Sequence, residues 1–199
     1  MEVITTHMNS DFDALGAMAG ARLLYPGAVC VFPGSQEKSL RNFFLASSIY
    51  ASGFGRAKNV DLKKVTRLIL VDTDQPSRIG RFAELVGKEG VEVHIYDHHP
   101  KNSESIRGAF ELCENVGATT TLMVEELLRR GIKIGPADAT VMLLGIMEDT
   151  GKLTFAASTP RDFFAAGKLL EAGADLSSVA GFLEPELTAE QVFLLEQLL

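Results

Sequence analysis

Four short segments of the sequence concentrate histidine and aspartate, two side chains that bind divalent cations well. In chain order they are Thr6-His7-Met8-Asn9-Ser10-Asp11-Phe12-Asp13, Asp72-Thr73-Asp74, Asp97-His98-His99-Pro100 and Glu148-Asp149-Thr150-Gly151. Three of the four histidines of the chain lie in these segments. Mixed imidazole and carboxylate ligands suit manganese, cobalt, iron or zinc better than calcium. The segments therefore predict a metal site.

Such a site would suit the hydrolysis of phosphate esters. Phosphorus is shielded by negative oxygens, so attack requires a strong nucleophile and neutralisation of charge. Two divalent cations about 3.5–4 Å apart supply both, because they deprotonate a shared water and hold the phosphate oxygens. A carboxylate between the cations would reduce their repulsion, and four aspartates would balance their charge.

Each segment alone also has a structural explanation. His7 could be a strand-end histidine bonded to the backbone, while Asp11 and Asp13 could cap a helix. Asp149 could lie at a helix end that stops at Gly151. The four segments together, most of them directly after predicted strands, favour the metal site.

The four segments resemble the motifs of DHH phosphoesterases. The shared pattern is His-x-Asn-x-Asp-x-Asp, an isolated Asp after a strand, Asp-His-His, and Asp-Thr-Gly, and it covers about residues 1–155. This family includes oligoribonuclease-like enzymes and manganese-dependent inorganic pyrophosphatases. The resemblance implies two divalent cations, most readily manganese, with magnesium, cobalt, iron or zinc as alternatives.

The resemblance also implies a role for each residue of the motifs. One metal would be bound by His7, Asp11 and Asp72. The other metal would be bound by Asp13, Asp72, His98 and Asp149, so that Asp72 bridges the two. Asp97 and His99 would be catalytic, Asp97 by orienting an imidazole and His99 by contacting substrate phosphate or the leaving oxygen. We expect Asn9 to contact the substrate as well. Asp74 and Glu148 are expected to be solvated or to lie beside the ligands.

A narrower resemblance involves the segment Pro33-Gly34-Ser35-Gln36-Glu37-Lys38-Ser39-Leu40-Arg41. Together with the first motif, it resembles the start of bacterial fusion proteins in which DHH-type and CBS domains precede a tRNA nucleotidyltransferase or poly(A) polymerase domain. We therefore expect residues 1–183 to form a DHH catalytic domain. Residues 184–199 would be a linker and helix, beginning at Thr188, that lead to an absent C-terminal domain. The C-terminal domains of the parent polypeptide would then be partners of this chain. Within the segment, Lys38 and Arg41 could meet substrate phosphates, although a solvated helix face is the simpler interpretation.

Alternating strand and helix patterns position these motifs and predict an α/β fold. We expect a mostly parallel five-stranded sheet with helices on both faces, followed by a helical C-terminal segment from Pro136 onward. The predicted strands are 2–6, 28–32, 67–71, 91–96 and 109–113. The predicted helices before Pro136 are 13–24, 37–51, 78–87 and 119–130. Gly53-Phe54-Gly55 is predicted to be a loop. Since ligands bind at the carboxyl ends of parallel strands, the motifs fall where a site is expected.

Composition excludes other classes of protein. Hydrophobic residues make up 46% and charged residues 23% of the chain, which is typical of a globular domain. A formal net charge of −7 argues against a broad basic surface for duplex nucleic acid. We found no membrane-length apolar run and no signal peptide, and therefore expect a cytoplasmic protein without a membrane partner. Cys30 and Cys113 are expected to be core residues rather than a disulfide.

The leading functional hypothesis is a two-metal phosphoesterase that uses a metal-bridging hydroxide. Its substrates would be short single-stranded oligonucleotides or small nucleotides. One alternative is a hydrolase of inorganic pyrophosphate. Another is a metal-binding regulatory module of a larger tRNA nucleotidyltransferase or poly(A) polymerase protein.

Overall fold

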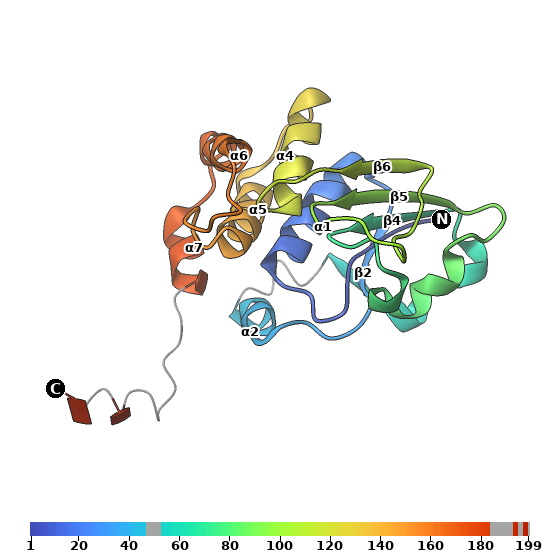
Figure 1. Cartoon of the computed structure of the whole chain (residues 1–199), viewed down its shortest axis with the longest axis horizontal. Helices are drawn as coiled ribbons and strands as arrows, with labels where there is room; N and C mark the ends of the chain where they lie inside the picture. Colours follow the sequence, from blue (N-terminus) through green and yellow to red (C-terminus); the bar gives the residue numbers. More distant parts are fainter. Residues whose placement is uncertain (47–52, 184–192, 195–196, 199) are drawn as a thin grey trace.

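A parallel β-sheet forms the centre of the computed structural model, which describes residues 1–46, 53–183, 193–194 and 197–198 (Figure 1). Within these residues the sheet has six strands in the order β3-β2-β1-β4-β5-β6. The strands are β1 (Glu2–Thr5), β2 (Val29–Phe32), β3 (Phe54–Arg56), β4 (Arg67–Val71), β5 (Glu92–Asp97) and β6 (Phe110–Cys113). The predicted parallel α/β class is confirmed.

The sheet has one strand more than the five that we predicted. The additional strand, β3, covers part of the segment Gly53-Phe54-Gly55, which we had predicted to be a loop. It pairs in parallel with β2, with Cys30 opposite Phe54 and Phe32 opposite Arg56. A three-residue edge strand with flanking glycine carries little sequence signal, because its conformation depends on hydrogen bonds to its neighbour.

The register of the central strands brings their carboxyl ends together. Thr5 of β1 lies opposite Leu70 of β4, and Val71 of β4 lies opposite Tyr96 of β5. The segments that follow these three strands therefore leave the sheet at the same edge. Three of the four polar motifs begin there.

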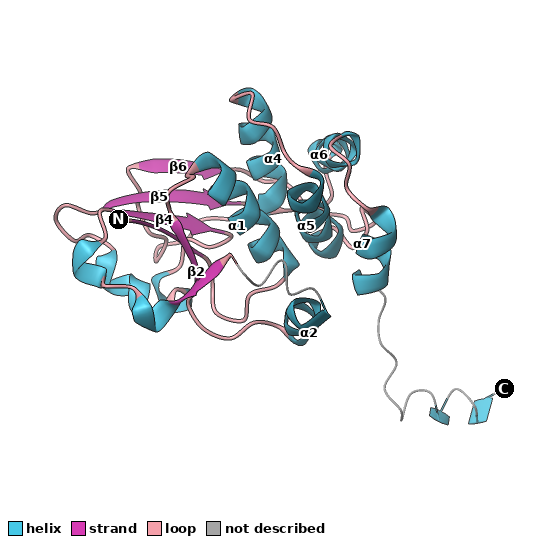
Figure 2. Ribbon diagram, turned by 180° about the vertical axis from the view of Figure 1, so that it is seen from behind, coloured by secondary structure: helices cyan, strands magenta, loops and turns pink. Residues whose placement is uncertain are grey.

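The α-helices pack on one face of the sheet and on one another (Figures 1 and 2). They are α1 (Phe12–Leu24), α2 (Lys38–Ala46), α4 (Thr119–Arg129), α5 (Pro136–Asp149), α6 (Pro160–Glu171) and α7 (Leu176–Leu183). Both α1 and α4 contact the sheet, and α5 packs on α1. Ile4, Ile69 and Tyr96 of the sheet are fully buried in the core beneath these helices. The helical C-terminal segment that we predicted is confirmed by α5, α6 and α7.

Two glycines allow α1, α4 and α5 to cross at short distance. A Cβ atom at Gly16 of α1 would lie 2.6 Å from Thr120 Oγ1, and one at Gly145 of α5 would lie 2.8 Å from the Phe12 carbonyl oxygen. Both distances are shorter than real contacts allow, so larger side chains would push the helices apart. The close crossings bring Asp13 next to the first turn of α4.

The opposite face of the sheet is covered by 3-10 helices instead of α-helices. They are η1 (Ala57–Asn59), η2 (Leu62–Lys64), η3 (Pro76–Arg78) and η4 (Gly80–Leu85). Phe82 and Leu85 of η4 are fully buried against the sheet. The α-helix predicted for residues 78–87 was therefore wrong. Gly80 and Gly87 have φ angles of +53° and +74°, left-handed conformations that an α-helix does not contain.

The remaining predictions concern the cysteines, the membrane and the C-terminal residues. Cys30 is buried, Cys113 is half-buried, and both are free thiols. No helix among the described residues has the length and apolarity needed to cross a bilayer. The helix predicted from Thr188 and the domain boundary after residue 183 fall mostly outside the described residues, so both stay predictions.

Candidate metal centre

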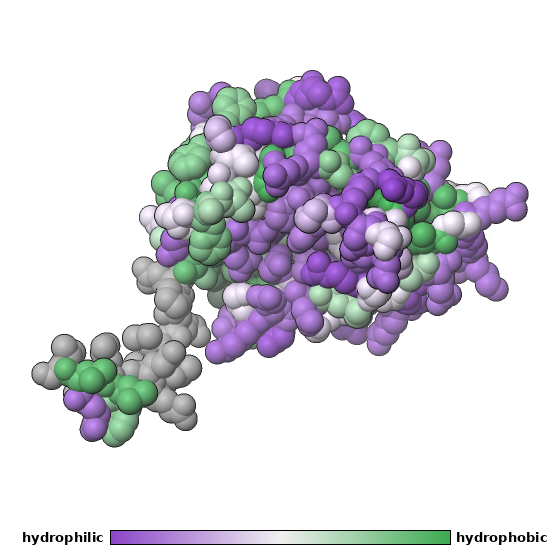
Figure 3. All heavy atoms as spheres, in the orientation of Figure 1, coloured by the Kyte–Doolittle hydropathy of each residue, from purple (hydrophilic) through white to green (hydrophobic). Residues whose placement is uncertain are grey.

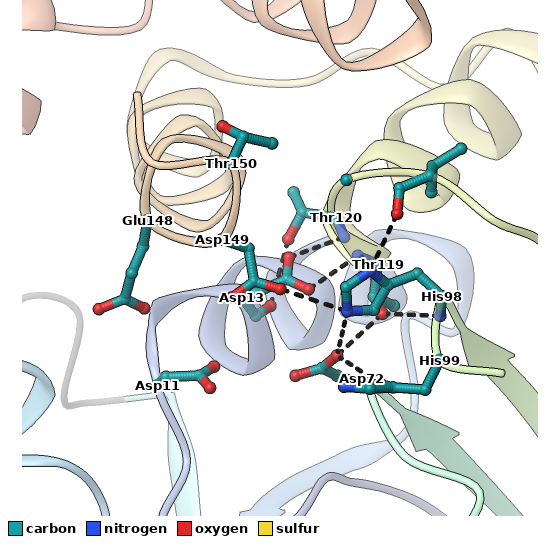
Figure 4. A network of polar contacts seen from close by, with 12 residues as sticks. Asp11, Asp13, Asp72, His98, His99, Thr119, Thr120, Glu148, Asp149 and Thr150 are labelled. Atoms are coloured by element: carbon teal, nitrogen blue, oxygen red, sulfur yellow. Dashed lines mark hydrogen bonds and ion pairs between the residues drawn. The ribbon is translucent and has the colours of Figure 1, made fainter. Parts of the chain in front are cut away.

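The predicted site residues converge at the carboxyl end of the central strands (Figure 4). Asp72 lies at the middle of the cluster, directly after β4, and is almost completely buried. Its φ angle of +58° is uncommon for a residue with a side chain. Its backbone N–H donates to the Tyr96 carbonyl oxygen over 2.9 Å, which fixes this turn against β5.

The first group of possible metal ligands consists of His7, Asp11 and Asp72. His7 Nε2 lies 3.1 Å from Asp72 Oδ2 and 3.7 Å from Asp11 Oδ2. His7 Nδ1 is 3.0 Å from the Met8 carbonyl oxygen. Because a carbonyl only accepts, Nδ1 carries the hydrogen, and Nε2 is the atom left to bind a cation.

The second group consists of Asp13, His98 and Asp149. One ligand atom from each residue lies within 4.8 Å of the others. His98 Nε2 is 3.2 Å from Asp149 Oδ2 and 3.6 Å from Asp72 Oδ1. His98 Nδ1 is 3.0 Å from the Val116 carbonyl oxygen, so its Nε2 is also the atom that faces the carboxylates.

Asp11 and Asp13 both contact helix N-termini, in different ways. Asp11 caps its own helix, since Oδ1 accepts from the Ala14 N–H over 2.9 Å, while Oδ2 faces His7. Asp13 caps another helix: its two oxygens accept from the N–H groups of Thr119 (2.7 Å) and Thr120 (2.9 Å) of α4. The N-cap residue of α4 itself, an alanine, has no side chain that could accept these bonds. Both aspartates therefore cap helices, and both also belong to the groups of possible metal ligands.

The proximity of these acidic groups changes their affinity for protons. Burial, and then the charge of Asp72, raise the pKa of Asp11 to about 6. Burial and the same charge raise the pKa of Asp13 well above its usual value. Burial also disfavours the charged form of Asp72, but hydrogen bonding to His7 and the charges of the histidines lower its pKa overall. Asp72 is thus the carboxylate best held in its charged form.

Asp97 and His99 form a pair beside these groups. His99 Nδ1 lies 2.7 Å from Asp97 Oδ1, and the His99 backbone N–H donates to the same oxygen. Asp97 is buried, whereas 44% of the His99 side chain is exposed. The hydrogen bond to Asp97 raises the pKa of His99, an effect larger than the opposing one of burial. His99 also forms a third possible ligand group, with Asp72 and His98, that overlaps the others.

Asn9 lies outside these ligand groups. It is exposed, has a φ angle of +58°, and its side-chain oxygen accepts a hydrogen bond from Ser35. Asp74, two residues after Asp72, is also outside the groups. It is buried, and its Oδ2 has no hydrogen-bond partner in the described part of the chain.

Two features of the site were not predicted from the sequence. Thr119 donates its hydroxyl hydrogen to Asp72 Oδ1 (2.9 Å) and accepts from the His98 backbone N–H (3.3 Å). Glu148, expected to be solvated or beside the ligands, is partly buried and accepts from the Phe12 N–H over 2.6 Å. Burial, and then the charge of Asp11, raise the pKa of Glu148 to about 7. For the contact between Thr119 and Asp72, the sequence offered only the run Thr119-Thr120-Thr121 at the start of a predicted helix.

Comparison with known proteins agrees with the motif pattern. The sequence model of the N-terminal domain of the DHH family matches residues 2–146. The chain belongs to the DHH family. The family motifs His7, Asp72 and the Asp97–His99 segment all lie within the matched residues.

The relatives of this DHH domain include larger proteins. It is 54% identical over 199 residues to an A-adding tRNA nucleotidyltransferase of Geobacter sulfurreducens, covering all of this chain but 23% of that protein. It is 29% identical to a bifunctional oligoribonuclease and PAP phosphatase of Thermus thermophilus, covering 91% of this chain and 53% of that protein. The DHH domain thus spans about a quarter to a half of these relatives. The predicted resemblance to the first part of a nucleotidyltransferase fusion protein is confirmed.

A solved structure has the same fold. An exopolyphosphatase-related protein from Bacteroides fragilis superposes with a TM-score of 0.75 at 18% identity. The match covers 98% of this chain and 59% of that protein. At this identity the likeness concerns the fold alone.

Proposed function

We propose that this DHH domain is a two-metal phosphoesterase that hydrolyses short single-stranded oligonucleotides or small nucleotides. The observation that supports this most directly is the position of Asp72. Its Oδ2 lies 3.1 Å from His7 Nε2, and its Oδ1 lies 3.6 Å from His98 Nε2. One carboxylate therefore faces two imidazoles of two separate ligand groups, as a bridging ligand must.

The chemistry of the donor atoms fits divalent cations. His98 Nε2 is buried and makes no hydrogen bond within the described residues, although carboxylate oxygens lie nearby. A cation would satisfy this nitrogen and reduce the repulsion between the aspartates. We propose manganese, with magnesium, cobalt, iron and zinc as alternatives. His7, Asp11 and Asp72 would hold one ion. Asp13, Asp72, His98 and Asp149 would hold the other.

The bound cations would supply an activated water and neutralise charge on the phosphate oxygens. Side chains of the protein would orient the substrate and the proton donor. Asp97 holds the His99 ring through Nδ1, which leaves the exposed Nε2 to donate to a phosphate or leaving-group oxygen. Asn9 is exposed and lies between His7 and Asp11 in the sequence. We propose that its side-chain amide contacts the substrate.

The relatives support a nucleotide substrate. One of them is described as an oligoribonuclease and PAP phosphatase. Another is an A-adding tRNA nucleotidyltransferase, of which this chain matches 23%. That relative favours a second candidate function, a metal-binding regulatory module whose partners are the C-terminal domains of a parent polypeptide. Both functions are compatible with the predicted cytoplasmic location.

Metal analysis and turnover separate these candidates. We expect the manganese-loaded chain to hold two ions and to release nucleotide from short RNA. Asp72→Asn should abolish release and reduce metal content, whereas Asp61→Asn, at an exposed aspartate that caps η2 on the opposite face of the sheet, should change neither. Two bound ions without turnover of any phosphate ester would favour the regulatory module. Turnover of inorganic pyrophosphate alone would contradict the nucleotide substrate.

A further inference from the structure

A pocket of about 930 Å³ is lined by residues of α2, the end of α5 and α7. Its size is at the upper end of the range for small-molecule sites. Its lining includes Lys38, Asn42 and Leu45 of α2, Met147 of α5, Lys152, and Phe182 of α7. None of these side chains belongs to the ligand groups of the metal centre.

Glu148 connects this pocket to the metal centre. It lines the pocket and directly precedes Asp149 at the end of α5. Its carboxylate accepts from the Phe12 N–H, and Phe12 lies between Asp11 and Asp13 in the sequence. Figure 4 shows Glu148 and Asp149 on the same end of α5, with Asp11 below them. A ligand in the pocket would therefore lie next to a phosphate at the metals.

Two lysines give one part of the pocket a positive charge. Lys38 begins α2, and Lys152 follows Asp149 by three residues. Arg41, one turn further along α2, donates to the Gln36 carbonyl oxygen. In an acidic chain, two lysines beside an acidic metal centre are suited to phosphate oxygens that the metals do not reach.

The backbone holds Lys152 at the pocket in an uncommon conformation. Lys152 and Leu153 have φ angles of +60° and +65°. Their N–H groups donate to the Met147 carbonyl oxygen (2.6 Å) and to Thr150 Oγ1 (3.0 Å). Left-handed residues with side chains persist only where neighbouring contacts hold them, and they are common at functional sites.

The other part of the pocket is apolar. Leu45, which lines it, is 85% exposed. The Phe182 ring packs edge-on against Phe43 with their centroids 4.8 Å apart, so it is fixed to the core of the domain. In Figure 3, hydrophilic side chains cover α2 and apolar side chains gather over α7. An aromatic ring beside aliphatic groups is suited to stack a nucleobase.

We propose that this pocket binds a nucleoside monophosphate unit of the substrate, next to the phosphate that is hydrolysed. Lys38 and Lys152 bind its phosphate, and Phe182 contacts its base. The inference rests on the proposed phosphoesterase function and specifies its substrate class as a nucleotide chain. Inorganic pyrophosphate has no apolar part to fill the pocket.

Binding experiments on the manganese-loaded 199-residue chain test the pocket without any turnover. AMP, adenosine and inorganic phosphate are titrated separately by calorimetry. We expect AMP to bind more tightly than adenosine or inorganic phosphate. Lys38→Gln or Lys152→Gln should weaken the binding of AMP by about five- to tenfold. Phe182→Leu should weaken AMP and adenosine but leave phosphate unchanged. Lys58→Gln, at an exposed lysine of η1 on the opposite face of the sheet, is the matched control and should bind AMP as wild type does.

Methyl NMR of the chain loaded with diamagnetic magnesium locates the ligand independently. The methyl signals of Met147 and Leu45 should shift with AMP and stay unchanged with inorganic phosphate. Equal binding of AMP and phosphate, or wild-type AMP affinity in both lysine variants, would overturn the proposal. AMP binding as expected without turnover of any ester would overturn the proposed function and support the pocket. Turnover of oligonucleotides with AMP binding insensitive to all three substitutions would overturn the pocket alone.

Discussion

The Thr119 hydroxyl donates to Asp72 Oδ1 over 2.9 Å and thereby joins the first turn of α4 to the end of β4. The same hydroxyl oxygen accepts from the His98 backbone N–H over 3.3 Å. The buried Thr119 side chain therefore positions both Asp72 and His98, the histidine of the second ligand group.

Thr119→Val should weaken metal binding, because it removes the hydroxyl while keeping nearly the same shape. We expect manganese affinity to fall by about 10- to 100-fold, as is common when a hydrogen-bond partner of a metal ligand is lost. Calorimetric titration with manganese measures the effect. Thr119→Ser keeps the hydroxyl and should bind manganese as wild type does. Equal affinities in the valine and serine variants would exclude this positioning role.

Metal affinity should fall as the pH is lowered, because cations must displace protons from the centre. Burial raises the pKa of Asp11 to about 6, so this carboxyl is mostly charged at pH 7.5 and mostly neutral at pH 5.5. Burial disfavours the charged form of His98, but its contact with Asp149 and the charges of Asp13 and Asp72 outweigh this effect and raise the pKa to about 10. Asp11 is therefore protonated more often at pH 5.5 than at pH 7.5, and His98 is protonated at both, so a cation must displace more protons at the lower pH.

The change should be at least about tenfold in manganese affinity between pH 7.5 and pH 5.5. Titrations in two buffers with different ionisation enthalpies would also detect protons released on binding. Affinity that is constant across this range, with no proton release, would show that the centre binds no metal through these groups.

Gly145→Ala should destabilise the fold and disturb the second ligand group. The added Cβ would lie 2.8 Å from the Phe12 carbonyl oxygen and 3.0 Å from the Asp13 Cα atom, so α1 and α5 must move apart. We expect the free energy of unfolding to fall by about 1–3 kcal/mol, as for other overpacked cores. Urea unfolding of the metal-free chain measures this free energy.

Gly167→Ala is the matched control for this substitution. Gly167 lies inside α6, and a Cβ atom there would have no neighbour within 4 Å. Replacing a helical glycine by alanine should stabilise the chain by about 0.5–1 kcal/mol. A Gly145→Ala variant as stable as Gly167→Ala would contradict the close crossing of α1 and α5.

The residues that follow the central strands could be predicted from local patterns in the chain. Strand patterns that lead into His7, Asp72 and Asp97 predict parallel strands, and parallel strands share one edge at their carboxyl ends. The meeting of these three residues could therefore be predicted from local patterns and one general rule. Their order along the chain also identified the family.

The contacts between helices and the additional edge strand β3 could not be predicted in this way. Asp13 caps α4, Thr119 contacts Asp72, and Glu148 accepts from Phe12, although these partners are between 47 and 136 residues apart in the sequence. Such contacts depend on where helices cross, which periodicity within a single helix does not encode. The strand β3 and the pocket beside Lys152 arose in the same way, because hydrogen bonds to β2 and the packing of α2 against α7 are properties of the folded chain.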